Sequence, residues 1–233
     1  MSGIRTYTCS TCGDKWNESI NKLAHTYKQT VIPAAIGKDG KIVKKCSACG
    51  ATVTSAIAKI SSVSLSAVNY TYSGGVKTPS VTVKDSKGKT LTNGRDYTVT
   101  YPSGRKNVGR YSVKITFKGN YSGTKTLTYN INPKGTSMSK LTAVKRGFKA
   151  TWKKQSSQTT GYELQYSTSS NFKKGTKTVN ISKNKTTSKS IGKLSAKKKY
   201  YVRVRTYKTV KFGGKNVKLY SGWSKAKAVT TKK

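Results

Sequence analysis

Strict alternation of apolar and polar side chains is the feature that most limits how this chain can fold. It is clearest in residues 111–117, where Tyr, Val, Ile and Phe occupy every second position. A period of two places successive side chains on opposite faces of a β-strand, so that one face is buried and the other meets water. Shorter segments of the same kind recur at residues 97–101, 162–166 and 200–205. Because turn-forming runs separate these segments, the sequence predicts a mostly β protein made of antiparallel sandwiches.

The pattern divides the chain into three modules. Residues 1–62 contain all four cysteines and are predicted to form a small cysteine-rich, zinc-ribbon-like module. Residues 63–132 and residues 133–233 each repeat the alternation of short strands and turns. We therefore expect two tandem β-sandwiches after the cysteine-rich module.

The charge of the chain is extreme. It carries 47 Lys and Arg against 6 Asp and Glu, a formal net charge of +41. Residues 133–233 are the most basic part, and Glu163 is the only acidic side chain among them. The electric field of so large a positive charge attracts polyanions. Lysine greatly outnumbers arginine, which favours a diffuse, salt-sensitive attraction over the base-specific contacts that bidentate arginine makes.

The same composition argues against catalysis and against a membrane span. One histidine and six carboxylates leave few groups for acid–base chemistry near neutral pH. The sequence contains no recognisable nucleophile, metalloprotease or phosphate-binding motif, so we expect no enzyme. No stretch approaches about 18 consecutive apolar residues, so no transmembrane helix is expected. The first ten residues also lack the apolar segment of a secretory signal peptide.

Two C-x-x-C-G motifs are the only concentration of metal-grade ligands. They supply Cys9, Cys12, Cys46 and Cys49. Four thiolates can close a tetrahedral structural Zn²⁺ site, which makes zinc the predicted cofactor. Two disulfides or four free thiols are the alternatives. His25 could replace one ligand or lie on the surface.

The last module resembles a fibronectin type III domain. The resemblance rests on Trp152, on the Tyr-x-Leu-x-Tyr segment at 162–166, on the Tyr-x-Val-x-Val segment at 200–204 and on Ser-Gly-Trp-Ser at 221–224. The middle module resembles the Ig-like repeats of bacterial surface proteins, through residues 72–74, 96–101 and 117–123. The first module is similar to small cysteine-paired repeats that precede such domains, through residues 7–13 and 25–27. Together they resemble the C-terminal region of large surface or secreted proteins of Clostridia-like bacteria, where these modules serve as stalks and adhesive or polymer-binding appendages.

The sandwich pattern also predicts a binding face. If Tyr200, Val202 and Val204 point inward, their neighbours on the same strand point outward, and nearby lysines extend the stripe. The predicted polyanion-binding residues are Lys197, Lys198, Lys199, Tyr201, Arg203, Arg205, Lys225 and Lys227. A merely solvated outer face is the alternative.

These observations favour a non-enzymatic attachment or spacer module, extracellular or bound to the cell wall as part of a larger exported protein. Its expected partners are wall polymers or acidic glycans. Two alternatives remain. One is a bacteriophage virion protein, such as a decoration or fibre protein, which the missing signal peptide would fit. The other is charge-driven, non-specific binding of nucleic acid.

Overall fold

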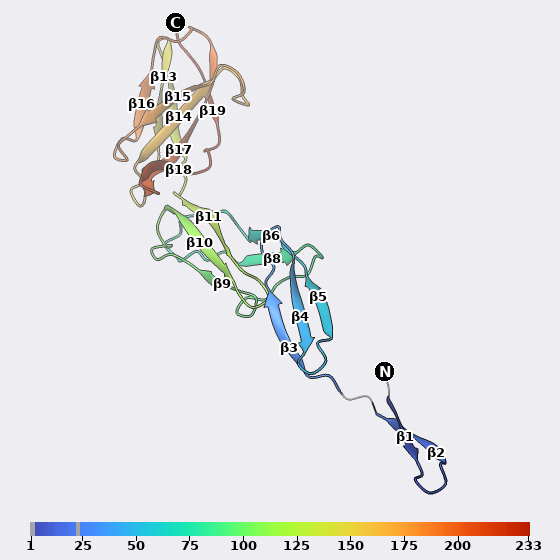
Figure 1. Ribbon diagram of the computed structural model, residues 1–233. Helices are drawn as coiled ribbons and strands as arrows, with labels where there is room; N and C mark the ends of the chain where they lie inside the picture. Colours follow the sequence, from blue (N-terminus) through green and yellow to red (C-terminus); the bar gives the residue numbers. More distant parts are fainter. Residues whose placement is uncertain (1–2, 22–23) are drawn as a thin grey trace.

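The computed structural model describes residues 3–21 and 24–233, and it confirms the prediction of a mostly β protein. The described residues form nineteen strands and no helix. Within these ranges, therefore, no helix is long and apolar enough to cross a membrane. The sheets follow one another along the molecule, from the N-terminal hairpin to the C-terminal sandwich (Figure 1).

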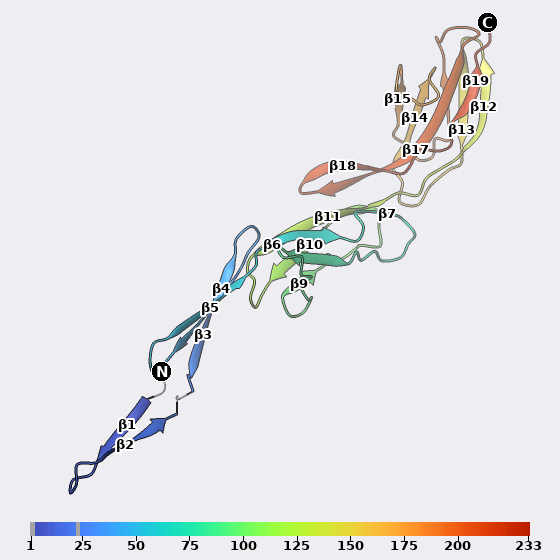
Figure 2. The same cartoon turned by 90° about the vertical axis from the view of Figure 1, so that its right-hand side faces the viewer.

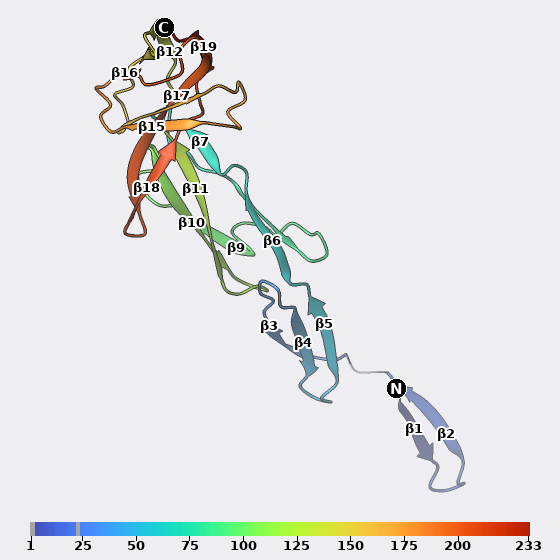
Figure 3. The same cartoon turned by 90° about the horizontal axis from the view of Figure 1, so that it is seen from above.

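Residues 3–21 and 24–57 form two separate sheets. An isolated hairpin precedes a three-stranded antiparallel sheet of order β3-β4-β5, and Figure 3 shows the hairpin lying beyond the end of that sheet. The strands are β1 (Gly3–Thr8), β2 (Lys15–Ile20), β3 (Tyr27–Ile32), β4 (Gly40–Cys46) and β5 (Thr52–Ile57). The three-stranded sheet docks on the middle module, because Ala34 is fully buried and its backbone N–H donates to the Asn120 carbonyl at 3.0 Å.

The middle module is a small sandwich of a two-stranded and a four-stranded sheet. The strands are β6 (Ile60–Leu65), β7 (Asn69–Thr71), β8 (Val81–Asp85), β9 (Tyr97–Thr100), β10 (Gly109–Phe117) and β11 (Thr124–Asn132). The sheet orders are β6-β8 and β7-β11-β10-β9. Val113, Ile115 and Phe117 all face the core, as the alternation predicts. Ile57 and Ile60 belong to the same core, so the three-stranded sheet and this sandwich share buried surface.

The last module is a larger sandwich. Its strands are β12 (Met138–Val144), β13 (Gly147–Trp152), β14 (Gly161–Ser167), β15 (Lys177–Ile181), β16 (Ser188–Ile191), β17 (Lys199–Phe212), β18 (Lys215–Tyr220) and β19 (Lys227–Thr230). One sheet has the order β12-β13-β16, and the other has the order β15-β14-β17-β18 with β19 paired to β17. Trp152, Leu164 and Val204 are buried between the sheets. Two tandem sandwiches are thereby confirmed.

A long hairpin joins the two sandwiches. The β17–β18 hairpin projects from the last sandwich toward β11 (Figure 2). Gln158 accepts hydrogen bonds from the Val108 backbone N–H, at 3.2 Å, and from the Lys208 ammonium. The Arg110 guanidinium lies 5.7 Å from the centre of the Phe212 ring. Burial at this junction lowers the pKa of Lys208.

Asp96 provides a pH-dependent contribution to the stability of the middle sandwich. Its carboxylate accepts hydrogen bonds from the Thr92 N–H at 2.8 Å and from the Arg95 guanidinium at 2.9 Å. The bonds from Arg95 hold the pKa of Asp96 below its ordinary value, although burial opposes them. A depressed folded-state pKa stabilises the protein above the unfolded-state pKa, about 3.9 for Asp. That contribution is lost as the pH falls through the folded-state value.

We therefore expect Asp96→Asn to lower the free energy of unfolding of this sandwich by about 1–2 kcal/mol at pH 7. The difference from the parent chain should shrink as the pH falls below about 4. Urea titration followed by hydrogen exchange at the amides of β9 and β10 measures it. A difference that stays constant down to pH 2 would contradict the assignment.

Candidate functional site

The two C-x-x-C-G motifs adopt the same turn. In each turn the glycine N–H donates to the carbonyl of the first cysteine at 3.0 Å, from Gly13 to Cys9 and from Gly50 to Cys46. Both glycines have left-handed backbones, with φ of 76° and 73°, a conformation that glycine adopts without the steric cost of a Cβ atom. The glycine that ends each C-x-x-C-G motif therefore suits the local geometry of both turns.

The two turns sit at the tips of two corresponding hairpins. Gly3 pairs with Ile20 in the first hairpin, just as Gly40 pairs with Ile57 in the second, and the register is the same along both. The β1–β2 and β4–β5 hairpins are thus copies of one unit. The spacing of glycine, the two cysteines and isoleucine is identical in the two copies, and this internal repeat is a signal that our reading of the sequence missed.

The structure does not bring the four cysteines together. Over residues 3–21 and 24–233, the metal-ligating side chains that converge are those of His25, Cys46 and Cys49, whose ligand atoms all lie within 4.8 Å of one another. Cys9 and Cys12 belong to the separate β1–β2 hairpin (Figure 1). Because each hairpin carries its own motif at its own tip, the two pairs of thiols do not share a centre in this arrangement. Zinc binding itself stays a prediction.

The turn also acidifies its first cysteine. A hydrogen bond from the Cys49 backbone, followed by one from the His25 side chain, lowers the pKa of Cys46 to about 6. Hydrogen bonds from Cys12 similarly lower the pKa of Cys9 to about 7. Such turns favour the thiolate, which is the form that binds metals.

A second candidate site lies at the end of the last sandwich. We define the cationic cap as the basic residues of three segments that meet there, namely the β12–β13 turn, the β16–β17 loop together with the first residue of β17, and the segment after β19. These residues, all exposed, are Lys145, Arg146, Lys193, Lys197, Lys198, Lys199, Lys232 and Lys233. The described part of this module carries no exposed carboxylate side chain to offset them, because Glu163 is buried.

Backbone hydrogen bonds hold the three segments of the cap together. The Arg146 N–H donates to the Lys232 carbonyl at 2.9 Å, and the Leu194 N–H donates to the Arg146 carbonyl at 2.9 Å. The Lys197 N–H donates to the Thr231 carbonyl at 3.1 Å. These backbone hydrogen bonds therefore bring together basic residues from segments that are far apart in the sequence.

Three residues of the cap have left-handed backbones. Arg146, Lys193 and Lys197 have φ of 44°, 59° and 50°. Each costs roughly 1–2 kcal/mol relative to glycine, and backbone strain of this kind is found preferentially at functional sites. Sequence reasoning found Lys197, Lys198 and Lys199 but missed the other five members. No turn signature marked Lys145 and Arg146, because two-residue hairpin turns favour Asn-Gly, Asp-Gly or Gly-Gly.

The arginines of the predicted stripe are engaged in a stack. The Arg203 guanidinium lies 4.0 Å from the Phe172 ring centre and 4.5 Å from that of Trp223. Arg205 lies 4.2 Å from Trp223 and 3.8 Å from Tyr220. We call these five side chains the arginine–aromatic stack.

Polar partners complete the stack. Arg205 forms an ion pair with Glu163 at 3.0 Å, and Arg203 donates to the Gln165 side-chain oxygen at 2.7 Å. Both arginines do lie on the outer face of β17, as predicted. Their donors are nevertheless already used by protein groups, which leaves less of their charge for a ligand.

The remaining stripe residues are distributed differently. Tyr201 lies beside Lys199, whose ammonium is 5.5 Å from its ring centre. Lys225 is exposed in the segment before β19. Lys227 pairs with the inward-facing Val202, and its ammonium donates to the Ser139 carbonyl of β12, on the opposite sheet. Lys227 therefore lies at the edge of the sandwich, apart from the Tyr201 face. Its position two residues before the buried Val229 was the sequence signal for this.

Comparison with known proteins supports the fold of the last module. Residues 131–220 match the family model of the fibronectin type III domain. This part of the chain is a fibronectin type III domain. The match covers β12 to β18 and includes the arginine–aromatic stack except Trp223. No curated protein matches the chain.

Solved structures give only distant similarity. A crystal structure of the FN1-FN3 domains of chicken CNTN1 has 14% sequence identity and a TM-score of 0.38, and it covers 85% of this chain and 79% of its own. A structure of titin domains has 14% identity and a TM-score of 0.31, with coverages of 99% and 83%. A beta-1,2-glucanase from Parabacteroides distasonis has 14% identity and a TM-score of 0.32, with coverages of 53% and 18%.

Proposed function

We propose that this chain is a non-enzymatic, extracellular module that binds an anionic wall polymer or acidic glycan through the cationic cap of its fibronectin type III domain. The observation that carries the proposal is the gathering of eight exposed basic residues on three hydrogen-bonded segments. Fibronectin type III domains typically serve as structural and binding modules, which agrees with a role that needs no catalytic centre.

The charge balance of the domain favours an anionic polymer over a small anion. Its one carboxylate side chain, Glu163, is 8% exposed and paired with Arg205. The outer surface of the domain is therefore cationic, with the densest charge at the cap. A polymer that follows this surface would release its counterions along several contacts at once, which strengthens binding and makes it salt-dependent.

The scarcity of uncovered aromatic rings favours a glycan or wall polymer over single-stranded nucleic acid as the ligand. Binding of unpaired bases relies on aromatic rings that are free to stack with them. The exposed side of this domain offers few such rings, because Trp223 and Tyr220 are covered by the guanidinium groups of Arg203 and Arg205.

Two matched variants test the proposal. The cap variant replaces four basic residues by glutamine: Lys145, Lys193, Lys197 and Lys198. The control variant replaces four exposed lysines at the opposite end of the same sandwich: Lys153, Lys154, Lys211 and Lys215. Both variants lose the same charge, so a difference between them reports position alone.

Affinity for heparin, for poly(glycerol phosphate) and for duplex DNA should be measured from 50 to 500 mM salt. We expect the cap variant to lose at least about tenfold more affinity than the control for the first two polymers. The slope of log K against log salt should become shallower by about three for the cap variant. Equal losses in the two variants would contradict a localised site. Tighter binding to DNA than to both other polymers would favour the nucleic-acid alternative.

A further inference from the structure

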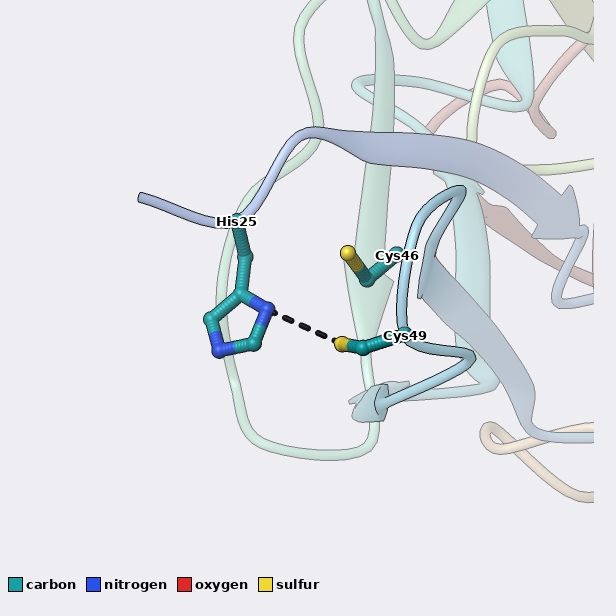
Figure 4. A group of neighbouring side chains, drawn as sticks. All are labelled: His25, Cys46 and Cys49. Carbon is teal, nitrogen blue, oxygen red and sulfur yellow. Dashed lines mark hydrogen bonds between the residues drawn. The ribbon is translucent and has the colours of Figure 1, made fainter. Parts of the chain in front are cut away.

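We infer that His25, Cys46 and Cys49 form a zinc site that is contained within the β3–β5 sheet, with one coordination position open to solvent. The His25 Nδ1 atom lies 3.1 Å from the Cys49 Sγ atom, and the imidazole faces both thiols (Figure 4). This differs from a closed site made of four thiolates, because it uses the histidine and leaves out Cys9 and Cys12.

The spacing of the three ligand atoms suits a tetrahedral metal. Zinc bonds of about 2.3 Å to sulfur and 2.0 Å to nitrogen separate neighbouring ligand atoms by roughly 3.5–3.8 Å. The His25 Nδ1–Cys49 Sγ separation is 3.1 Å and the other two separations are at most 4.8 Å, which is compatible with this range. Small rotations of the exposed His25 and Cys49 side chains toward the buried Cys46 thiol are therefore enough to bind the ion.

The backbone holds the three ligands in place. Cys46 ends β4 and pairs with Tyr27 at the start of β3, two residues after His25. The Ser47 N–H, inside the C-x-x-C turn, donates to the Thr26 carbonyl at 3.1 Å. The segment that carries the histidine is thus bonded directly to the turn that carries the thiols.

The chemical nature of the three ligand atoms determines which metal ion binds. Two thiolates and an imidazole favour a thiophilic ion such as Zn²⁺, whereas Mg²⁺ and Ca²⁺ require oxygen ligands. Three protein ligands leave a fourth position, and since His25 and Cys49 are both exposed, water can reach it. We assign that position to a solvent molecule.

The first repeat explains why one ion per chain is expected. Its Cys9–Cys12 turn has the same backbone bonds as the second turn. The sequence contains a single histidine, and it lies beside the second turn. Two thiols alone supply too few ligands for a stable zinc site.

Metal content of the full chain, purified under reducing conditions, tests the inference. The double variant Cys9→Ser/Cys12→Ser is the matched control, because it removes the same turn chemistry from the other repeat. We expect one zinc per chain in the parent protein and in this control. Cys46→Ser/Cys49→Ser should bind none, and His25→Ala should bind at least about tenfold more weakly.

Cobalt substitution gives a second readout that does not depend on folding yield. The Co²⁺ absorption spectrum should show tetrahedral thiolate coordination, unchanged in Cys9→Ser/Cys12→Ser and shifted in His25→Ala. Loss of the metal in the Cys9 and Cys12 variant would instead support a shared four-cysteine site. A parent chain with intact thiols that binds no zinc at micromolar concentration, or a Cys46–Cys49 disulfide detected by mass, would overturn the inference.

Discussion

Trp152→Ala should lower the free energy of unfolding of the fibronectin type III domain by about 3–5 kcal/mol. Trp152 is 2% exposed and packs against Tyr162, with the two ring centres 5.4 Å apart. It also pairs across the sheet with Met138. Truncation to alanine leaves a cavity between the two sheets. The sheets cannot move together to fill it without breaking their other contacts. Urea-dependent hydrogen exchange at the amides of β13 and β14 measures the loss in the intact chain.

Trp152→Phe provides the matched control. The indole Nε1 atom is buried and has no hydrogen-bond partner. Phenylalanine therefore removes volume without breaking a hydrogen bond, and we expect a loss of about 1–2 kcal/mol. Equal losses for the two variants would show that the indole contributes something other than packing. A loss below about 1 kcal/mol for Trp152→Ala would contradict its place in the core.

Glu163→Ala should cost about 3 kcal/mol, more than a surface ion pair contributes. The Glu163 side chain is 11% exposed and that of Arg205 is 22% exposed. Removing the carboxylate leaves the guanidinium between Trp223 and Tyr220 without a counter-charge. No other acidic side chain exists in residues 133–233 to replace it.

A double-mutant cycle isolates this interaction. Arg205→Met removes the buried charge, so Glu163→Ala should cost much less in that background than it does in the parent chain. Urea unfolding followed by exchange at the amides of β14 and β17 gives the four free energies. Additive losses would mean that the two side chains contribute independently, contrary to the ion pair seen here.

The strands and the two cores could be predicted from local sequence alone. Alternation fixes which side chains share a face, and burial then follows from hydrophobicity. Val113, Ile115 and Phe117 face one core as expected, and Trp152, Leu164 and Val204 face the other. The net charge and its concentration in residues 133–233 also needed no coordinates.

The partners of the functional side chains could not be predicted in this way. Arg203 and Arg205 were expected on the outer face, and they are there. Their stacking on Trp223, however, depends on how the segment before β19 folds back across β17. The contact joins Trp223 to arginines that precede it by about twenty residues. It depends on how distant backbone segments pair, and no periodic pattern in the local sequence indicates that pairing.

A cationic β protein with two thiol turns could be predicted from the residues alone, because side-chain periodicity and composition are local properties of the chain. Which charges and ligands lie next to one another depends instead on the three-dimensional arrangement of the strands. It gathered Arg146, Lys193 and Lys232 into one cap through hydrogen bonds between distant loops. It also placed His25 beside Cys46 and kept Cys9 on a separate hairpin. The physical reason is that strand pairing fixes the distances between remote segments, which residue spacing alone leaves open.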